Sequence, residues 1–183
     1  MALVLVPLAK GFEDLEAITI TDLMRRAQID VVTAGLTPGP ITGSRGTIVV
    51  PDMSLDEALQ QSYDMVVLPG GQPGATHLEK DERIQSLVKR MAADNKVTAA
   101  VCAAPKVLAV AGLLEGKRAT GFPGTLSADQ FPGIDISTDA VVTDGNIVTS
   151  RGPGTVMDFT LALIEILTDN DVRNQVEQAL HRP

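Results

Sequence analysis

The chain has 183 residues, of which 44% are hydrophobic and only 3% aromatic, and its formal net charge is -8. This length suits one domain with a sizeable aliphatic core, so we expect residues 1–183 to form a single domain. The negative charge argues against nucleic acids and anionic membranes as partners.

Apolar runs alternate with amphipathic stretches along the whole chain. The runs that we expect to form strands are 3–8, 30–35, 47–50, 65–68 and 97–101, followed by a hairpin of 140–143 and 146–149. The stretches that we expect to form helices are 15–28, 54–61, 81–94, 106–114, 155–167 and 169–180. Ser54 and Glu57 predict a capping box at the start of one of these helices. The alternation is typical of an α/β fold in which helices cover both faces of a mostly parallel sheet.

The sequence favours a location in a reducing compartment away from membranes. The apolar segment 2–9 lacks the basic region and cleavage site of a signal peptide, and no stretch approaches transmembrane length. The single cysteine, Cys102, cannot form an intramolecular disulfide. We therefore expect a cytoplasmic protein.

The carboxyl ends of the predicted strands indicate where the functional site lies. Ligands of parallel α/β sheets bind outside these ends. In this chain they lead into the loop after Leu8, the loop after Leu68, Cys102, and the loop after Thr149. We expect these four places to meet at one edge of the sheet.

Cys102 lies between a predicted strand and the helix 106–114. The unpaired N–H groups and the dipole at a helix start favour negative charge, so we expect the pKa of this thiol to be lowered. A tight strand-to-helix turn needs small neighbours, and Ala100, Ala103 and Ala104 provide them. These features predict a nucleophile. The alternative is a buried structural cysteine, because free cysteine is often buried.

Glu16 lies in the first turn of the helix that follows the first strand. If its carboxyl faces Cys102, the two groups cannot both be charged cheaply, so one of them keeps its proton. A protonated carboxyl beside a thiolate is a pairing suited to acid–base catalysis. The alternative is compensation of the helix dipole, which Glu13 and Asp14 already provide.

Gly70 and Gly71 directly follow a buried strand. Glycines there allow backbone N–H groups to approach a developing oxyanion closely. The alternative is an ordinary turn after Pro69. The segment is not a P-loop, because no Gly-Lys-Ser/Thr follows it.

Histidine is scarce in this chain, with only His77 and His181. His77 follows Gly71 in a predicted loop and is a candidate partner for the cysteine, although an exposed loop residue is the alternative. His181 belongs to the polar tail. One cysteine and two distant histidines have no metal-ligand spacing, so we expect no metal and no other cofactor.

Four segments of the chain resemble motifs of the ThiJ/PfpI superfamily, and within it the branch of the parkinsonism-associated protein deglycase and bacterial YajL. They are Glu-Asp-Leu-Glu-Ala at 13–17, Leu-Pro-Gly-Gly at 68–71, Ala-Ala-Val-Cys-Ala-Ala-Pro at 99–105 and Thr-Ser-Arg-Gly-Pro-Gly-Thr at 149–155. The segments 24–27 and 44–46 are similar to the same branch. The resemblance covers nearly the whole chain, in order.

This resemblance implies a flavodoxin-like three-layer α/β sandwich and a homodimer. It implies that Cys102 is a nucleophile on a strained elbow and that Glu16 is a protonated carboxyl hydrogen-bonded to its sulfur. The amides of Gly71 and Ala103 would form an oxyanion site, with Gly70 in the same backbone segment.

The resemblance also implies that Arg26, Arg45 and Arg151 line the dimer side of the pocket, where their positive charge favours anions. Ser150 and Pro153, from the last of the four segments, are expected in the same pocket. The alternative for Arg26 and Arg151 is that of ordinary helix-end and loop charges.

The chain departs from part of the superfamily at Phe122, which stands where some members have a histidine in a Thr-His-Pro type segment. No histidine then completes a triad, so a dyad of Cys102 and Glu16 must carry any chemistry, and peptidase activity is disfavoured.

The function that the resemblance favours is that of a glyoxalase III or deglycase-like enzyme acting on α-oxoaldehydes or their early adducts. Cys102 would add to the aldehyde, and Glu16 would move a proton between the adjacent carbons. The alternative is an oxidative-stress sensor or chaperone without turnover, in which Cys102 is oxidised to a sulfinate. An isonitrile hydratase-like enzyme ranks lower.

Overall fold

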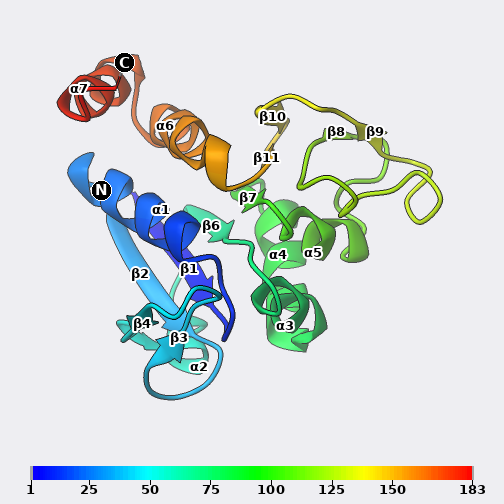
Figure 1. Cartoon of the computed structure of the whole chain (residues 1–183), viewed down its shortest axis with the longest axis horizontal. Helices are drawn as coiled ribbons and strands as arrows, with labels where there is room; N and C mark the ends of the chain where they lie inside the picture. The colour runs from blue at the N-terminus through cyan, green and yellow to red at the C-terminus, as the bar shows by residue number, and fades with distance from the viewer. Residues whose placement is uncertain (1, 183) are drawn as a thin grey trace.

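A seven-stranded sheet forms the centre of the protein, whose computed structural model describes residues 2–182 (Figure 1). The strands lie in the order β10-β11-β7-β6-β1-β2-β5, and all neighbours are parallel except β10 and β11. The bounds are β1 Leu3–Leu8, β2 Asp30–Gly35, β5 Met53–Ser54, β6 Met65–Leu68, β7 Val97–Val101, β10 Val141–Asp144 and β11 Ile147–Ser150. The predicted, mostly parallel sheet is confirmed.

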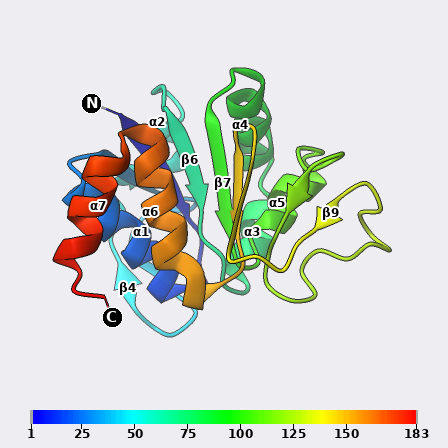
Figure 2. The same cartoon turned by 90° about the horizontal axis from the view of Figure 1, so that it is seen from above.

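Helices cover both faces of this sheet, as Figure 2 shows for α1, α6 and α7 on one side and α3, α4 and α5 on the other. The first group comprises α1 Asp14–Arg26, α6 Val156–Leu167 and α7 Asn170–Ala179. The second comprises α2 Leu55–Ala58, α3 Gly74–Lys80, α4 Glu82–Ala93 and α5 Pro105–Val110. Within residues 2–182, none of the helices is both long and apolar enough to cross a bilayer.

Strand β1 shows why the sheet is built from continuous apolar runs. Val4, Val6 and Leu8 pack into the core with α1 and α6, whereas Leu5 packs into the opposite core with α3 and α4. All four side chains are at most 1% exposed. A strand buried on both faces has no position for a polar side chain, which explains the pattern.

The structure differs from the sequence prediction at α3. The sequence predicts a loop after Gly71, because Pro73 and Gly74 usually interrupt regular structure. In the structure, Gly74 is instead the first residue of the helix. A helix tolerates such residues at its start, where the N–H groups have no intrahelical partners.

The helix after Cys102 is shorter than predicted, because α5 ends at Val110. Gly112 has φ +80°, a left-handed conformation that commonly follows the end of a helix. The structure also contains two small two-stranded sheets, and of their four strands the sequence predicts only β4. They are β3 Ile41–Thr42 with β4 Ile48–Val49, and β8 Arg118–Ala119 with β9 Asp135–Ile136.

The order of the strands places a crevice at the carboxyl ends of β1 and β6. The chain leaves β1 through α1 on one face and leaves β6 through α3 and α4 on the other. Such a reversal is the point at which doubly wound α/β sheets bind ligands. Glu16 follows β1, Gly70 follows β6 and Cys102 follows the adjacent β7, so the topology brings all three to this edge.

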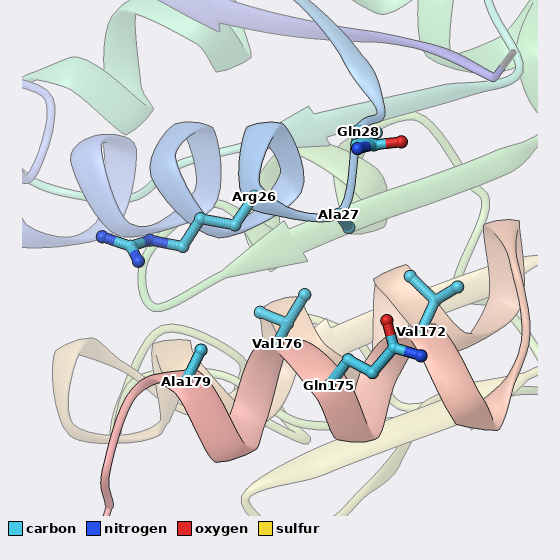
Figure 3. A pocket seen from close by; sticks show the side chains of 7 residues that line it. All are labelled: Arg26, Ala27, Gln28, Val172, Gln175, Val176 and Ala179. Carbon is cyan, nitrogen blue, oxygen red and sulfur yellow. The ribbon is translucent and has the colours of Figure 1, made fainter.

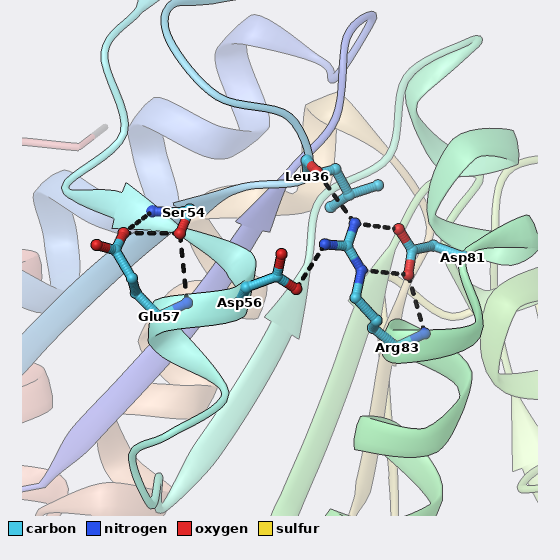
Figure 4. A network of polar contacts seen from close by, with 6 residues as sticks. All are labelled: Leu36, Ser54, Asp56, Glu57, Asp81 and Arg83. Atoms are coloured by element: carbon cyan, nitrogen blue, oxygen red, sulfur yellow. Dashed lines mark hydrogen bonds and ion pairs between the residues drawn. The ribbon is translucent and has the colours of Figure 1, made fainter.

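Helix α2 starts with the capping box that the sequence predicts (Figure 4). The Ser54 N–H donates to Glu57 Oε2 at 2.9 Å, and the Glu57 N–H donates to Ser54 Oγ at 3.3 Å. These bonds satisfy N–H groups that the helix itself leaves unpaired. Hydrogen bonds from Ser54 also lower the pKa of Glu57.

Arg83 connects the start of α4 to two other segments (Figure 4). Its guanidinium donates to Asp81 at 2.6 and 3.0 Å, to Asp56 of α2 at 2.8 Å, and to the backbone oxygen of Leu36 at 3.0 Å. The hydrogen bond with Arg83 is the main cause of the lowered pKa of Asp81. Arg83 therefore fixes the α3–α4 junction against the end of β2.

We predict that Arg83→Met lowers the free energy of unfolding at neutral pH by about 1–2 kcal/mol, because Asp81 loses its partner in a partly screened site. Arg90→Met, on the exposed face of the same helix, is the matched control and should change it by less than about 0.5 kcal/mol. Urea denaturation measures both.

The pH dependence gives a second readout. The folded-state pKa of Asp81 is lowered, so its stabilising contribution is present above the ordinary carboxyl pKa and is lost as pH falls through the lowered value. The stability difference between the wild type and Arg83→Met should therefore narrow in acid. Equal stability of the Arg83 and Arg90 variants would contradict the role assigned to Arg83.

Candidate active site

Cys102 occupies a sharp turn between β7 and α5. Its φ of +63° lies in the left-handed region, which a residue with a side chain adopts only when its surroundings hold it there. The Cys102 N–H donates to the Ser150 oxygen at 3.0 Å, and the Cys102 oxygen accepts from the Phe122 N–H at 2.7 Å. These two bonds fix the peptide groups on either side of the sulfur, so the predicted elbow is present.

Glu16 is fully buried in the first turn of α1, and its carboxyl lies against Cys102. One oxygen, Oε2, accepts the Gly70 N–H at 2.7 Å. The other, Oε1, is buried and has no hydrogen-bond partner within the described part of the chain. The Cys102 thiol lies close enough to this carboxyl that each group shifts the pKa of the other.

Two backbone amides face the sulfur. The N–H groups of Gly71 and Ala103 hydrogen-bond to Cys102, and these bonds favour a negative charge on it. The Gly70 N–H is bound to Glu16 instead, so Gly70 does not act as the oxyanion donor that the sequence predicts. The site thus has two amide donors at the sulfur and one at the carboxyl.

Gly70 is required by close packing. A Cβ at this position would lie 2.7 Å from the Cβ of Cys102, 2.9 Å from the Ala103 nitrogen and 2.9 Å from Glu16 Oε2. Gly71 has φ +86°, and a Cβ there would collide with the backbone nitrogen of Glu13. Only glycine lets the loop after β6 pass this close to both Cys102 and the Glu16 carboxyl.

The two acidic groups of the site both have raised pKa values. Burial raises the pKa of Glu16 to about 7, against the opposing hydrogen bonds from Gly70 and Cys102. Burial, and then the charge of Glu16, raise the pKa of Cys102 to about 12, against the amides of Gly71 and Ala103. The sequence-based prediction that the pKa of the Cys102 thiol is lowered is therefore wrong when Glu16 is ionised. Between about pH 7 and 12 the pair holds one proton.

Arg26 does not reach this site within one chain. It follows Glu16 by ten residues on α1, a distance of about 15 Å along the helix axis. Its Nε donates to Asp22 at 2.7 Å. Arg26 lies beside a hollow of about 390 Å³ between the end of α1 and α7, from which its guanidinium points away (Figure 3).

The other predicted pocket residues are engaged in local contacts. The Arg45 N–H donates to Asp14 at 2.8 Å, and the Arg151 guanidinium donates to the Thr138 oxygen at 3.0 Å. Pro153 opens a short 3₁₀ helix, Pro153–Thr155. Their roles stay predictions.

Ser150 and His77 are used differently from the sequence prediction. The buried Ser150 hydroxyl donates to the Ala140 oxygen at 2.8 Å, so Ser150 supports Cys102 only through its own backbone oxygen. His77 lies exposed on α3, with Nδ1 3.0 Å from the Lys10 oxygen. No contact links His77 to Cys102 within residues 2–182.

The sequence prediction missed a polar cavity of about 380 Å³ beside the nucleophile. Its wall includes Gln72 and Ala103, each directly next to a residue of the site. The other polar side chains that line it are Thr76, Glu79, Lys106, Thr125 and Gln130. Gln72 and Lys106 directly adjoin the motifs of the site in the sequence, so these two residues could have been predicted near it. Thr76 and Glu79 could not, because they belong to helix α3, which the sequence did not predict.

Within residues 2–182, no group of three or more His, Cys, Asp or Glu side chains is placed to hold a metal ion.

A sequence profile described as the DJ-1/PfpI family matches residues 2–166. The chain belongs to this family. It is 43% identical over 166 residues to DJ-1 homolog B of Arabidopsis thaliana, covering 88% of this chain and 37% of that protein. The chain spans less than half the length of the two Arabidopsis DJ-1 homologs that it matches.

Two further DJ-1/PfpI relatives align over almost their whole length. A protein from Pyrococcus abyssi named deglycase is 32% identical over 164 residues, covering 90% of this chain and 98% of that one. The crystal structure of Drosophila melanogaster DJ-1beta superposes with a TM-score of 0.93 at 36% identity, covering 98% and 97% of the two chains. The resemblance stated from the motifs and the flavodoxin-like sandwich are thus confirmed.

We predict that Glu16→Gln lowers the pKa of Cys102 below about 12, because the neighbouring charge disappears while the amides of Gly71 and Ala103 remain. The rate of alkylation by iodoacetamide against pH measures this value, and Cys102 is the only cysteine to react. Glu13→Gln is the matched control, because Glu13 is only the last contributor to the pKa of Glu16. A thiol pKa that is unchanged in Glu16→Gln would show that the two groups are not coupled.

Proposed function

We propose that this protein is a cysteine-dependent enzyme that converts α-oxoaldehydes, such as methylglyoxal and glyoxal, or their early adducts into hydroxy acids. The observation that carries the proposal is the buried Glu16 carboxyl, which lies beside the Cys102 thiol and has one oxygen without a hydrogen-bond partner among the described residues. The sulfur also receives two backbone amides. The relative named deglycase supports an enzymatic role. A free thiol of this kind suits a reducing compartment such as the cytoplasm.

The reactive form of the site carries its single proton on Glu16. A proton on the carboxyl gives Glu16 a hydrogen-bond donor and leaves no unpaired charge in this fully buried position. The charge of Glu16, which raises the pKa of Cys102, is then absent, and the amides of Gly71 and Ala103 stabilise the thiolate. The nucleophile and its acid are therefore created by one proton transfer.

The reaction with methylglyoxal follows from these groups. The thiolate of Cys102 bonds to the aldehyde carbon, and the resulting alkoxide takes the proton of Glu16. The Glu16 carboxylate then removes the hydrogen of that carbon as a proton, which gives an enediol(ate), and returns it to the adjacent carbon. The hydroxyl proton of the first carbon passes to the oxygen of the second, so that the first carbon becomes the carbonyl of a lactoyl thioester. Water cleaves the C–S bond and releases lactate and the thiol. The aldehyde carbon is oxidised and the ketone carbon reduced, so no external oxidant or reductant is needed.

The amides of Gly71 and Ala103 have a defined part in this sequence. They face the sulfur before any substrate binds and lie where negative oxygen develops on the carbon bonded to it. Donors held in place by the backbone need no reorganisation during the reaction.

A redox role is the second candidate, and the same two amides favour it. Sulfinate oxygens on Cys102 would accept hydrogen bonds from the Gly71 and Ala103 N–H groups and from a protonated Glu16. Cys102 is 8% exposed, so small oxidants reach it more easily than large substrates do.

A second copy of the chain is the partner that we propose for the α1 side of the molecule. Leu15, Ile18, Ile48 and Val50 are 51%, 48%, 66% and 73% exposed, although each is a large apolar residue. Asp14 bonds the loop before β4 to the start of α1, so these side chains belong to connected elements. Exposed apolar groups of this kind mark interaction surfaces.

We predict that the double substitution Ile48→Lys and Val50→Lys shifts the protein from dimer to monomer in sedimentation velocity. The reason is that two apolar side chains that the proposed dimer would bury are replaced by charged ones. Val110→Lys, at an exposed apolar position on α5, is the control that should leave the mass unchanged. A wild-type protein that sediments as a monomer would refute the proposed dimer.

We predict that Cys102→Ser abolishes lactate formation from methylglyoxal and that Glu16→Gln reduces kcat about 10²–10⁴-fold, the usual contribution of a positioned acid–base group. Lactate is measured enzymatically, with Glu13→Gln as the control at a neighbouring carboxylate. Undiminished turnover in Cys102→Ser would refute the enzyme. Absence of turnover in the wild type, combined with peroxide oxidation confined to Cys102, would favour the redox role.

A further inference from the structure

A separate cavity of about 470 Å³ lies at the carboxyl ends of β1 and β2. Ala9 and Lys10 directly follow β1, Leu36 directly follows β2, and the rest of the wall includes residues of α3 and of the start of α4. Ligands of parallel α/β sheets bind outside the carboxyl ends of the strands. The volume is also in the range of sites for small organic molecules. Position and size therefore make this cavity a candidate ligand site.

Two lysines without ion-pair partners line the cavity. Lys10 and Lys80 are exposed, and neither belongs to the ion pairs formed among residues 2–182. The described lining also contains a third cation, Arg83, and one carboxylate, Asp81. These two bind each other, and Arg83 also binds Asp56 (Figure 4). The charges that remain for a ligand are those of the two lysines, although the chain as a whole has a net charge of -8.

His77 connects the two segments that carry these lysines. It lies on α3 three residues before Lys80, which places both side chains on the same side of the helix. Its Nδ1 lies 3.0 Å from the Lys10 oxygen, and because a carbonyl only accepts, Nδ1 carries the hydrogen of this bond. In the neutral ring Nε2 is then an acceptor, and it has no hydrogen bond within residues 2–182. The wall of the cavity thus combines two cations with one free acceptor.

This combination indicates the chemistry of a matching ligand. Two ammonium groups favour an anion with two charges, such as a phosphate monoester, over a singly charged one. A phosphate dianion has no hydrogen to donate to His77 Nε2, so this acceptor calls for a hydroxyl elsewhere on the ligand. Ala9 and Leu36 belong to the apolar packing beneath the cavity and offer a surface for the carbon skeleton.

We propose that this cavity binds a small phosphate monoester that also carries a hydroxyl group. Lys10 and Lys80 bind the phosphate, and the hydroxyl donates to Nε2 of His77. Neither Cys102 nor Glu16 lines the cavity, so the site is separate from the candidate active site and does not depend on the proposed function.

The test is isothermal titration calorimetry at fixed ionic strength with three phosphate probes. They are sn-glycerol 3-phosphate, which has a phosphate monoester and two hydroxyls, propyl phosphate, which has the same charge and no hydroxyl, and inorganic phosphate. We expect glycerol phosphate to bind several-fold more tightly than the other two, because only this probe satisfies Nε2 of His77 as well as both lysines. Equal affinities would show only a general attraction of anions and would overturn the proposal.

Lysine variants connect binding to this cavity. Lys10→Met and Lys80→Met should each raise the Kd of glycerol phosphate about tenfold, because each removes a charge-assisted hydrogen bond. Lys89→Met, at an exposed lysine of α4 outside the lining, is the matched control and should leave the Kd unchanged. A Kd that neither cavity variant raises more than Lys89→Met does would place the bound phosphate elsewhere and overturn the proposal.

A substitution at His77 tests the hydroxyl contact separately. His77→Asn keeps an N–H that replaces the Nδ1 donor toward Lys10 but has no counterpart of the Nε2 acceptor. It should abolish the preference for glycerol phosphate over propyl phosphate and leave the affinity for propyl phosphate unchanged. Equal weakening of both probes would indicate a purely structural histidine and contradict the assigned contact.

Vesicles that contain phosphatidic acid distinguish a free compound from a lipid headgroup with the same phosphate monoester. We expect no cosedimentation with them, because the net charge of -8 opposes approach to an anionic membrane. Cosedimentation that Lys10→Met abolishes, without binding of free glycerol phosphate, would overturn the assignment of a small free ligand.

Discussion

The geometry of the site depends on one constraint, which is that a carboxyl and a thiol share a small, largely buried space. Glu16 is fully buried and Cys102 nearly so, and the charge of either group disfavours that of the other. The backbone around them divides its donors accordingly, with one amide at the carboxyl and two at the sulfur. Ionisation of one group raises the pKa of the other, and every chemical role proposed for the site depends on which of the two carries a proton.

The fold supplies this arrangement from four separate segments. The carboxyl ends of β1, β6 and β7 bring Glu16, Gly70 and Cys102 together, and Ser150 at the end of β11 holds the elbow through its backbone oxygen.

Sequence reasoning found the residues of the site more reliably than their environment. The alternation of apolar runs and helices predicts a mostly parallel sheet, and because its strands end at one edge, this is enough to bring Cys102 and Glu16 to the same edge. The direction of the thiol pKa could not be obtained in this way, because it depends on burial and on the distance to Glu16. The role of Gly70 was missed for a similar reason, since the sequence does not show that its N–H points at a carboxylate. Glu79 could not be predicted as a cavity residue, because Pro73 and Gly74 indicated a loop where helix α3 begins.

The tight fit around Gly70 has a consequence for how this protein can change over time. A side chain there would press at once on the nucleophile, on an amide donor and on the acid, so no compensating substitution at one neighbour restores the others. Gly154 is not constrained in this way, because its surroundings are open and its φ lies outside the left-handed region. A library randomised at both codons and selected for a working protein should return many residues at 154 and a single one at 70.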